Sequence, residues 1–256
     1  MSTGFVAKPG NGAMLRSSIS ITVLVAALAC AAGVAAAPLT LNDVNEAPLT
    51  TSAGDGFLDR LIQDAFRRAG AECKLVRHPA ERGLRNANAG IDDGDLNRIS
   101  GLESAYANLV RVPEKNMDMH FSAFTRTLKL QSASWSALAS HRVGIIRGWK
   151  ILESSLEGAG SVLFASDVHQ LFRMLKHDRA TVVLYSRLMG LAHIREFDHQ
   201  GVRVLEPPLA KREMFMYLHQ KHAALVPKIA AALREMKADG TYQRFYDETI
   251  EKLERR

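Results

Sequence analysis

The chain has 256 residues, 47% of them hydrophobic and 23% charged, and its formal net charge is +6 at pH 7. This length is enough for one large or two small domains. The basic residues are spread along the chain without a block of five, which argues against a nucleic-acid groove and indicates a mild preference for anionic ligands or surfaces.

The first 37 residues have the pattern of a secretory signal peptide. Lys8 and Arg16 precede an apolar run that ends in small residues, including Ala35 and Ala37. A run of about 20 apolar residues could also anchor the chain in a bilayer, but the small residues favour cleavage. We therefore predict export to the periplasm, with cleavage after Ala35 or Ala37. The net charge then falls from +6 to +4, because both basic residues are removed.

The two cysteines indicate neither a lipid anchor nor a disulfide. Cys30 lies in the leader, and Ala27-Leu28-Ala29 before it lacks the large aliphatic residue usually found three places ahead of a lipidated cysteine. Cys73 stands alone in a strand-like run, where a buried, inert thiol is expected.

After the leader, short apolar runs alternate with amphipathic helices. The first helix, predicted over 56–69, has apolar residues such as Phe57, Leu61 and Ala65 at four-residue spacing and ends at Gly70. Further helices are predicted over 80–89, 149–156, 223–237 and 241–253, and after the capping residues Asp167 and Ser186. Strands are predicted over 38–44, 74–76, 109–112, 142–146, 162–164, 181–184 and 202–205, with a short segment over 91–96. The alternation predicts parallel sheets covered by helices.

Two extended segments do not fit this alternation. Residues 117–124 and 213–218 are partly apolar and flank the middle of the chain. They suit either crossover strands that join two lobes or edge strands, so periodicity leaves the number of domains open.

Several segments in a fixed order resemble the family-3 periplasmic solute-binding proteins, the amino-acid type, over about residues 38–253. They are Gly56-Phe57-Leu58-Asp59-Arg60-Leu61, Pro79-Ala80-Glu81-Arg82, Gly90-Ile91-Asp92-Asp93-Gly94-Asp95, Phe121-Ser122-Ala123-Phe124, Arg142-Val143-Gly144-Ile145-Ile146-Arg147-Gly148 and Lys237-Ala238-Asp239-Gly240-Thr241-Tyr242. The sequence departs from the family where Ala123-Phe124 replaces Pro-Tyr, and where no clear Thr-x-x-Arg leads to Arg98.

The resemblance implies an α/β, two-lobed periplasmic-binding-protein type II fold, each lobe a mainly parallel sheet flanked by helices. It implies a leader at 1–37, a first lobe of 38–116 plus 219–256, and a second lobe of 117–218 that includes both crossover strands. It further implies a monomer that captures a small anionic or zwitterionic, amino-acid-like molecule for an ABC permease, without cofactor or turnover. A periplasmic enzyme on the same fold, similar to cyclohexadienyl dehydratase, and a sensor or interaction module that has lost its ligand remain alternatives.

A receptor cleft needs fixed donors and acceptors for charged ligand groups. Arg98 offers a planar fork of donors to a ligand carboxylate, or pairs at the surface with Asp95 or Glu103. Glu46, in the loop after the first strand, could accept a ligand ammonium, and Asp95 could face the cleft.

The second lobe contributes candidates at two strand-to-helix turns. Gly148 and Trp149 offer backbone N–H groups and a stacking surface, and Arg147 beside them adds charge. Tyr185 and Ser186, at the end of a later strand, could contribute hydroxyl and N–H donors. Each of these residues could instead pack or be solvated without touching a ligand.

No metal or catalytic motif is evident. The run from Asp93 begins like a calcium loop, but Arg98 stands where glycine is required and Ser104 where glutamate is required. His219 and His222 are three residues apart, without an acidic ligand nearby in sequence. Because nucleophile and phosphate-loop motifs are also lacking, we expect binding without catalysis.

Overall fold

The computed structural model describes residues 1, 3–7, 37–130 and 132–251. Residues Met1–Ala36 and Ala37–Arg256 are separate units, and the fold below is that of the second. The predicted leader lies almost wholly outside the described residues. Among those described, no helix is long and apolar enough to cross a bilayer.

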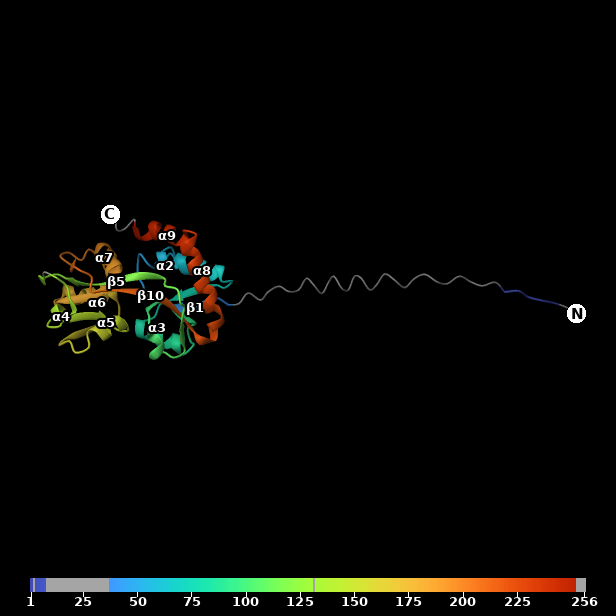
Figure 1. The fold of residues 1–256 in the computed structure, drawn as a ribbon, viewed down its shortest axis with the longest axis horizontal. Coiled ribbons are helices and arrows are strands. Elements are labelled where there is room, and N and C mark those ends of the chain that lie inside the picture. Colours follow the sequence, from blue (N-terminus) through green and yellow to red (C-terminus); the bar gives the residue numbers. More distant parts are fainter. Residues whose placement is uncertain (2, 8–36, 131, 252–256) are drawn as a thin grey trace. The chain divides into compact units, whose positions relative to one another are not determined.

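Ten strands form one mixed sheet (Figure 1). They are β1 (Leu39–Asn42), β2 (Cys73–Val76), β3 (Gly94–Ile99), β4 (Leu109–Arg111), β5 (Met117–Thr125), β6 (Val143–Ile146), β7 (Val162–Ala165), β8 (Val182–Ser186), β9 (Arg203–Val204) and β10 (Ala210–His219). Their order is β2-β1-β3-β10-β5-β8-β6-β7, while β4 pairs with β10 and β9 with β5.

The sheet has a parallel group at each end and an antiparallel pair between them. β1 pairs in parallel with β2 and β3, and β6 pairs in parallel with β7 and β8. β5 and β10 are antiparallel partners in the middle, and they join the two groups. The extended segments at 117–124 and 213–218 are therefore central crossover strands and not edge strands.

Helices cover both halves of the sheet. They are α2 (Phe57–Arg68), α3 (Ala80–Asn88), α4 (Trp135–Leu138), α5 (Lys150–Ser155), α6 (Val168–Lys176), α7 (Arg187–Glu196), α8 (Val226–Ala238) and α9 (Thr241–Tyr246), followed by a π-helical turn over Asp247–Glu251. The predicted cap of α6 is confirmed, since the Asp167 side chain accepts a hydrogen bond from the backbone N–H of Gln170 at 2.7 Å. The single-turn helix α4 was not predicted.

The first helix and the end of the chain pack together. α2 begins where the Asp59 carboxylate accepts the backbone N–H groups of Thr51 and Gly56, at 2.8 and 3.0 Å. Its first residue, Phe57, is fully buried, and its ring lies edge-on to Tyr242 and Tyr246 at centroid distances of 5.2 and 5.7 Å. The C-terminal helices thereby belong to the same half as β1, β2 and β3.

Candidate functional site

The carboxyl ends of the two parallel groups border one cleft. Residues 43–46 follow β1 and 77–80 follow β2, while 147–149 follow β6 and 166–168 follow β7. All four segments contribute to the cavities of this cleft. In open α/β sheets, ligands bind outside the carboxyl ends of parallel strands, so this cleft is the candidate ligand site.

The wider part of the cleft, the outer chamber, has a volume of about 310 Å³. One half lines it with the charged side chains of Asp43, Glu46 and Arg77 and with His78, among others. The other half lines it with Trp149, Ser166, Asp167 and Tyr185, among others. A volume near 300 Å³ lies at the lower end of the range for small-molecule sites.

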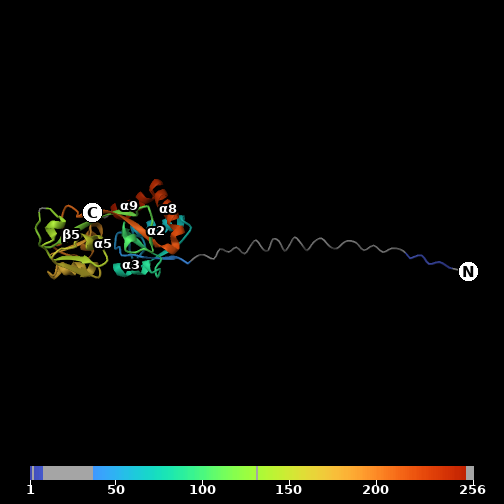
Figure 2. The same ribbon diagram turned by 60° about the horizontal axis from the view of Figure 1, so that its bottom comes forward.

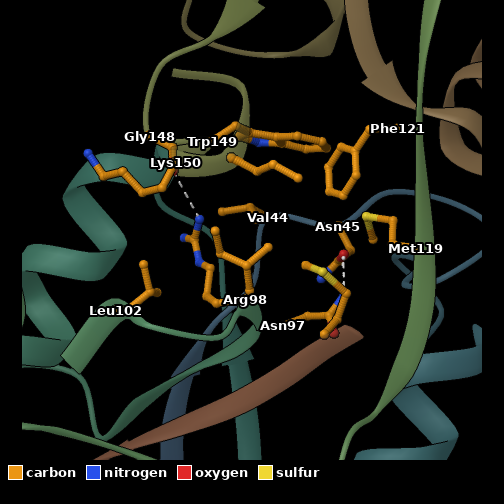
Figure 3. A pocket seen from close by; sticks show the side chains of 13 residues that line it. Val44, Asn45, Asn97, Arg98, Leu102, Met119, Phe121, Gly148, Trp149 and Lys150 are labelled. Atoms are coloured by element: carbon orange, nitrogen blue, oxygen red, sulfur yellow. Dashed lines mark hydrogen bonds between the residues drawn. The ribbon is translucent and has the colours of Figure 1, made fainter. Parts of the chain in front are cut away.

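The narrower part, the inner pocket, has a volume of about 30 Å³, which is enough for only one or two water molecules. Figure 3 shows Trp149 and Phe121 on one side of it, with Arg98, Asn45 and Asn97 on the other. Because this pocket is so small, a ligand could enter it only if the two halves moved apart.

Trp149 lines both spaces, as Val44 also does. Its ring stacks on Tyr185 at a centroid distance of 4.7 Å and an interplanar angle of 28°. Phe121 meets it edge-on at 5.9 Å. All three side chains are buried, so they form a fixed aromatic wall rather than a mobile cover.

Arg98 lies at the cleft, but most of its donors are already occupied. Its Nε and Nη2 atoms bind the two carboxylate oxygens of Asp95 at 2.7 and 2.9 Å, and Nη2 also donates to the Ala80 carbonyl at 3.0 Å. Nη1 points across the cleft to the Gly148 carbonyl at 3.4 Å (Figure 3). In this arrangement Arg98 presents a single nitrogen, and not a fork, to the inner pocket.

The alternative prediction for Arg98, an ion pair at the surface, is wrong about where the pair lies. Arg98 is 6% exposed and Asp95 is fully buried, so their ion pair is internal. Glu103, the other expected partner, lies 3.4 Å from Arg111 instead. Asp95 also accepts a hydrogen bond from Asn42 at 2.9 Å, which leaves it as the internal support of Arg98.

The two halves meet directly at the turn after β6. Gly148 has a φ of +87°, and a Cβ placed there would lie 2.4 Å from the backbone nitrogen of Glu81 on α3. The Nζ atom of Lys150 lies 2.6 Å from a carboxylate oxygen of Glu81. Figures 1 and 2 both show α3 and α5 next to each other at this contact. Only glycine combines this backbone conformation with so close an approach.

Asp43 is the most buried charge of the outer chamber. It is 1% exposed, and burial raises the pKa of its carboxyl group. Its Oδ1 atom accepts the N–H groups of Asn45, whereas its Oδ2 atom has no hydrogen-bond donor within the described part of the chain. The nearest cation is Arg77, whose Nη2 atom lies 3.5 Å from Oδ2. This oxygen is therefore a buried acceptor at the edge of the outer chamber, with the Arg77 guanidinium as its neighbour.

Glu46 and Arg77 are more exposed and complete the charge pattern. Burial also raises the pKa of Glu46, and the positive charge of Arg77, 3.6 Å away, opposes this effect. Arg77 is held in place by the Asn45 carbonyl at 3.0 Å and the Thr50 hydroxyl at 3.1 Å. Asp43, Glu46 and Arg77 therefore place two acidic groups and one fixed guanidinium within a few ångströms on this side of the outer chamber, and Asp167 adds a third acidic group from the other half.

Three of the predicted ligand residues lie away from both spaces. Besides the internal Asp95, Arg147 lies over the Phe164 ring at 4.3 Å, outside the cleft. Ser186 lines a different hollow, because successive residues of β8 point to opposite faces and Tyr185 faces the cleft. The structure brings together Glu46, Trp149 and Tyr185 in the outer chamber, and Arg98, Gly148 and Trp149 in the inner pocket. Their roles in ligand binding remain predictions.

Sequence reasoning missed several residues that line the cleft. Asp43 and Arg77 each follow a parallel strand directly, and Asn97 lies within β3. The rule that ligands bind at the carboxyl ends of parallel strands would have indicated Asp43 and Arg77. Phe121 is part of a central strand, and its position against Trp149 follows only from the strand order.

Two expectations about reactive side chains have different outcomes. His222 has no acidic residue nearby in sequence, but the fold brings Asp93 to it, and its Nε2 atom lies 2.7 Å from the Asp93 carboxylate. Burial raises the pKa of Asp93, but hydrogen bonds from Lys221, Thr40 and His222 outweigh it and lower the pKa to about 2. No group of three or more metal-ligating side chains converges among the described residues. Burial raises the pKa of Cys73 to about 12, in agreement with an inert thiol.

No family model matches the chain. A curated relative from Shewanella oneidensis, described as an uncharacterized protein, is 27% identical over 178 residues, which are 65% of this chain. The matched region is 66% of that relative's length, so the chain spans less than two thirds of it.

Solved structures with a similar fold share little sequence with the chain. A histidine kinase sensor domain with similarity to periplasmic binding proteins has a TM-score of 0.74 at 15% identity, covering 83% of this chain and 95% of that one. The glutamate-bound GluR0 ligand-binding core of Nostoc punctiforme has a TM-score of 0.70 at 19% identity, covering 83% of this chain and 99% of that one. The substrate-binding protein of an amino acid ABC transporter has a TM-score of 0.69 at 12% identity, covering 84% of this chain and 99% of that one. The predicted two-lobed periplasmic-binding-protein fold is confirmed.

Proposed function

We propose that the protein captures a small zwitterionic, amino-acid-like molecule in the outer chamber and presents it to an ABC-type importer from the periplasm. The observation that carries this proposal is the charge pattern at the carboxyl ends of the parallel strands. Asp43 offers a buried oxygen without a hydrogen-bond donor in the described chain, and Arg77 stands 3.5 Å from it. An ammonium group suits the acidic side and a carboxylate suits the guanidinium.

Closure of the lobes would complete the site. Trp149 and Tyr185 supply an apolar wall to the same chamber that holds the charged groups. Burial between the lobes removes water, which strengthens each charged contact with the ligand. The similar solved structures include an amino acid ABC transporter's binding protein and a glutamate-bound core, which supports an amino-acid-like ligand.

A thermal-shift screen of amino acids, organic acids and polyamines, followed by calorimetry, tests the proposal. A ligand at 100 times its Kd should stabilise the folded protein by about 2.7 kcal/mol. We expect Asp43→Asn and Arg77→Gln to weaken binding at least about tenfold, equivalent to 1.4 kcal/mol. Arg234→Gln, at an exposed arginine of α8, removes one charge away from the cleft and should leave the affinity unchanged. Wild-type affinity in both cleft variants would contradict the proposal.

A sensor role is the second candidate, because a histidine kinase sensor domain has a similar fold. Both functions require the same ligand cleft, so binding measurements do not separate them. Uptake of the labelled ligand by cells that lack the protein separates the two functions. Loss of uptake supports the importer, whereas normal uptake with a lost transcriptional response to the ligand supports the sensor.

An enzyme on this fold is the third candidate, because Glu46 lines the outer chamber and burial shifts the pKa of its carboxyl group upward, the direction that a general acid needs. Asp95 is unsuited to that role because Arg98 holds its carboxylate from both oxygens. Turnover of a bound compound that is abolished by Glu46→Gln, with binding retained, would establish catalysis. An unchanged compound after prolonged incubation would support binding alone.

A further inference from the structure

Three asparagine side chains form a buried chain of hydrogen bonds beside the ligand cleft, the amide relay. They are Asn45 in the loop after β1, Asn97 in β3 and Asn116 directly before β5. All three are at most 3% exposed. Asn45 and Asn97 also line the inner pocket, where Figure 3 shows the hydrogen bond between them. Because an unmade hydrogen bond is costly in a buried place, such a chain holds its members in fixed orientations.

The relay runs from the start of β5 to the outer chamber. The Nδ2 atom of Asn116 donates to the Oδ1 atom of Asn97 at 3.2 Å, and the Nδ2 atom of Asn97 donates to the Oδ1 atom of Asn45 at 3.2 Å. The Nδ2 atom of Asn45 then donates to the Asp43 carboxylate at 2.8 Å. All three amides therefore point the same way, with the nitrogen of each directed toward Asp43.

Both ends of the relay require this direction. At the first end, the Nδ2 atom of Asn116 also donates to the Leu96 carbonyl at 2.8 Å, and a carbonyl can only accept. At the other end, the ionised carboxylate of Asp43 can only accept. Between these fixed ends, Asn97 must present its oxygen to Asn116 and its nitrogen to Asn45. The orientation of Asn97 therefore decides which way the Asn45 amide points.

Asn45 is the member of the relay that holds the charged groups of the outer chamber. Its backbone N–H and its Nδ2 atom both donate to the Oδ1 atom of Asp43, at 2.9 and 2.8 Å. Its carbonyl accepts from the Nη1 atom of Arg77 at 3.0 Å and from the Thr50 hydroxyl at 2.9 Å. The side chain of Asn45 thus acts on Asp43, and its backbone acts on Arg77.

Asp43 depends on these donors because it is buried. Burial raises the pKa of its carboxyl group, and the hydrogen bonds from Asn45 and the charge of Arg77 oppose this effect. Glu46 in the same loop and Tyr185 of β8 also interact electrostatically with Asp43. Loss of a donor from the relay would therefore shift the balance toward the protonated form of Asp43.

We infer that Asn97 is a positioning residue for the ligand cleft, which fixes the direction of the Asn45 amide and thereby the donor that holds Asp43 as an acceptor. This inference rests on the proposed function, in which Asp43 forms the acidic side of the ligand site. The relay also begins where the two halves join, because Asn116 precedes the crossover strand β5 and its backbone N–H donates to the Met214 carbonyl of β10 at 2.7 Å.

Titration of the Asp43 carboxyl group by carbon-13 NMR tests this inference without a ligand. The Asp43 signal is identified as the one that Asp43→Asn removes. Asn97→Leu keeps the approximate size of the side chain but removes its amide, so the Asn45 amide is free to turn away from Asp43. We expect the proton affinity of Asp43 to rise at least about threefold. If Asn97→Leu does not fold, Asn97→Val, whose smaller side chain suits a strand, should give the same rise.

Two control variants show whether the effect comes from the relay. Asn45→Ala removes the donor itself and should raise the proton affinity of Asp43 at least as much. Asn108→Leu removes a half-buried amide outside the relay, whose Nδ2 atom donates to the Asn88 carbonyl at 2.9 Å, and should leave the titration unchanged.

Two results would overturn the inference. The first is an unchanged Asp43 titration in the folded Asn97 variants beside a clear rise in Asn45→Ala. The second is an equal rise in Asn108→Leu, which would assign the effect to general loosening of the fold. A ligand screen in which nothing binds would instead overturn the proposed function, because the NMR titration measures the positioning of Asp43 by itself.

Discussion

His193 is a buried titratable residue in a cluster of rings between α6 and α7. Its ring lies 5.0 Å from that of His169, 5.1 Å from that of His199 and 4.9 Å from that of Phe172. The side chain is largely buried, and its Nε2 atom has no hydrogen-bond partner in the described chain. Burial, and then the neighbouring His199 and His169, lower its pKa to about 4. The native fold therefore holds His193 neutral.

This predicts a loss of stability in mild acid. An unfolded histidine takes up a proton near pH 6.5, whereas folded His193 does so only near pH 4. Because the unfolded state binds more protons between these values, stability falls as the pH drops through this window. Since a tenfold difference in proton affinity is worth about 1.4 kcal/mol, the loss approaches roughly 3 kcal/mol.

Urea unfolding of the wild type and His193→Leu at pH 7.5 and 4.5 measures this effect. We expect the free energy of unfolding of His193→Leu to fall by about 2 kcal/mol less than that of the wild type between these pH values. His177→Leu, which replaces an exposed histidine after α6, is the control variant. Its free energy of unfolding should fall as much as that of the wild type. Equal losses in all three proteins would show that His193 is not held neutral by the fold.

At the scale of elements, α3 and α5 hold the two halves together through one ion pair. Lys150 lies between Glu81 of α3, at 2.6 Å, and Glu153 of its own helix, at 3.0 Å. The side chains of Lys150 and Glu81 are 30% and 23% exposed, so water screens the attraction only in part.

A double-mutant cycle with Glu81→Gln and Lys150→Gln should therefore give a coupling of about 0.5–1 kcal/mol in the free energy of unfolding, decreasing in salt. The pair of Glu81 with Arg85, within α3 and at an arginine that is 76% exposed, serves as the comparison and should give a smaller coupling. If the coupling between Glu81 and Lys150 is no larger than that between Glu81 and Arg85, or does not change with salt, this ion pair does not hold the two halves together.

The elements also show where local patterns are sufficient. The helix predicted over 56–69 is α2, because apolar spacing and Gly70 are local signals. The segment predicted over 91–96 proved to be strand β3, which extends to Ile99 because it pairs there with β10. In the same way β10 begins at Ala210, before the predicted start at 213, because these first residues pair with β5. Strand pairing is not visible in a single segment.

At the scale of the whole molecule, Gly148 controls how closely the halves approach. Replacing it by alanine places a Cβ 2.4 Å from the Glu81 backbone, so the halves must separate. We expect Gly148→Ala to increase the radius of gyration in small-angle X-ray scattering and to weaken cleft ligands more than about tenfold.

Gly158→Ala is the matched control for this prediction. Gly158 has a similar left-handed φ of +82°, but no atom lies within 4 Å of an added Cβ. Both variants therefore carry the same backbone strain, and only one of them has the steric contact. Equal changes in scattering and affinity for both variants would attribute the effect to backbone strain and not to the contact between the halves.

Export is a further prediction for the whole chain. If residues 1–37 are a leader, protein from the periplasmic fraction should have an intact mass that corresponds to a start at Ala36 or Pro38. A membrane-bound chain of full length, or a lipid-modified Cys30, would contradict cleavage at these positions.

The sequence alone determined the helices other than α4, most of the strands and the alternation that defines the α/β class, because these depend on periodicity and turn residues within short segments. It also indicated Gly148, Trp149 and Tyr185 near strand ends, where the structure places them at the cleft. The tertiary structure alone decided that Asp95 supports Arg98 internally, that Arg147 and Ser186 face elsewhere, and that Asp43 and Arg77 line the outer chamber. The physical reason is that burial, strand order and the pairing of distant charges depend on residues far apart in the chain.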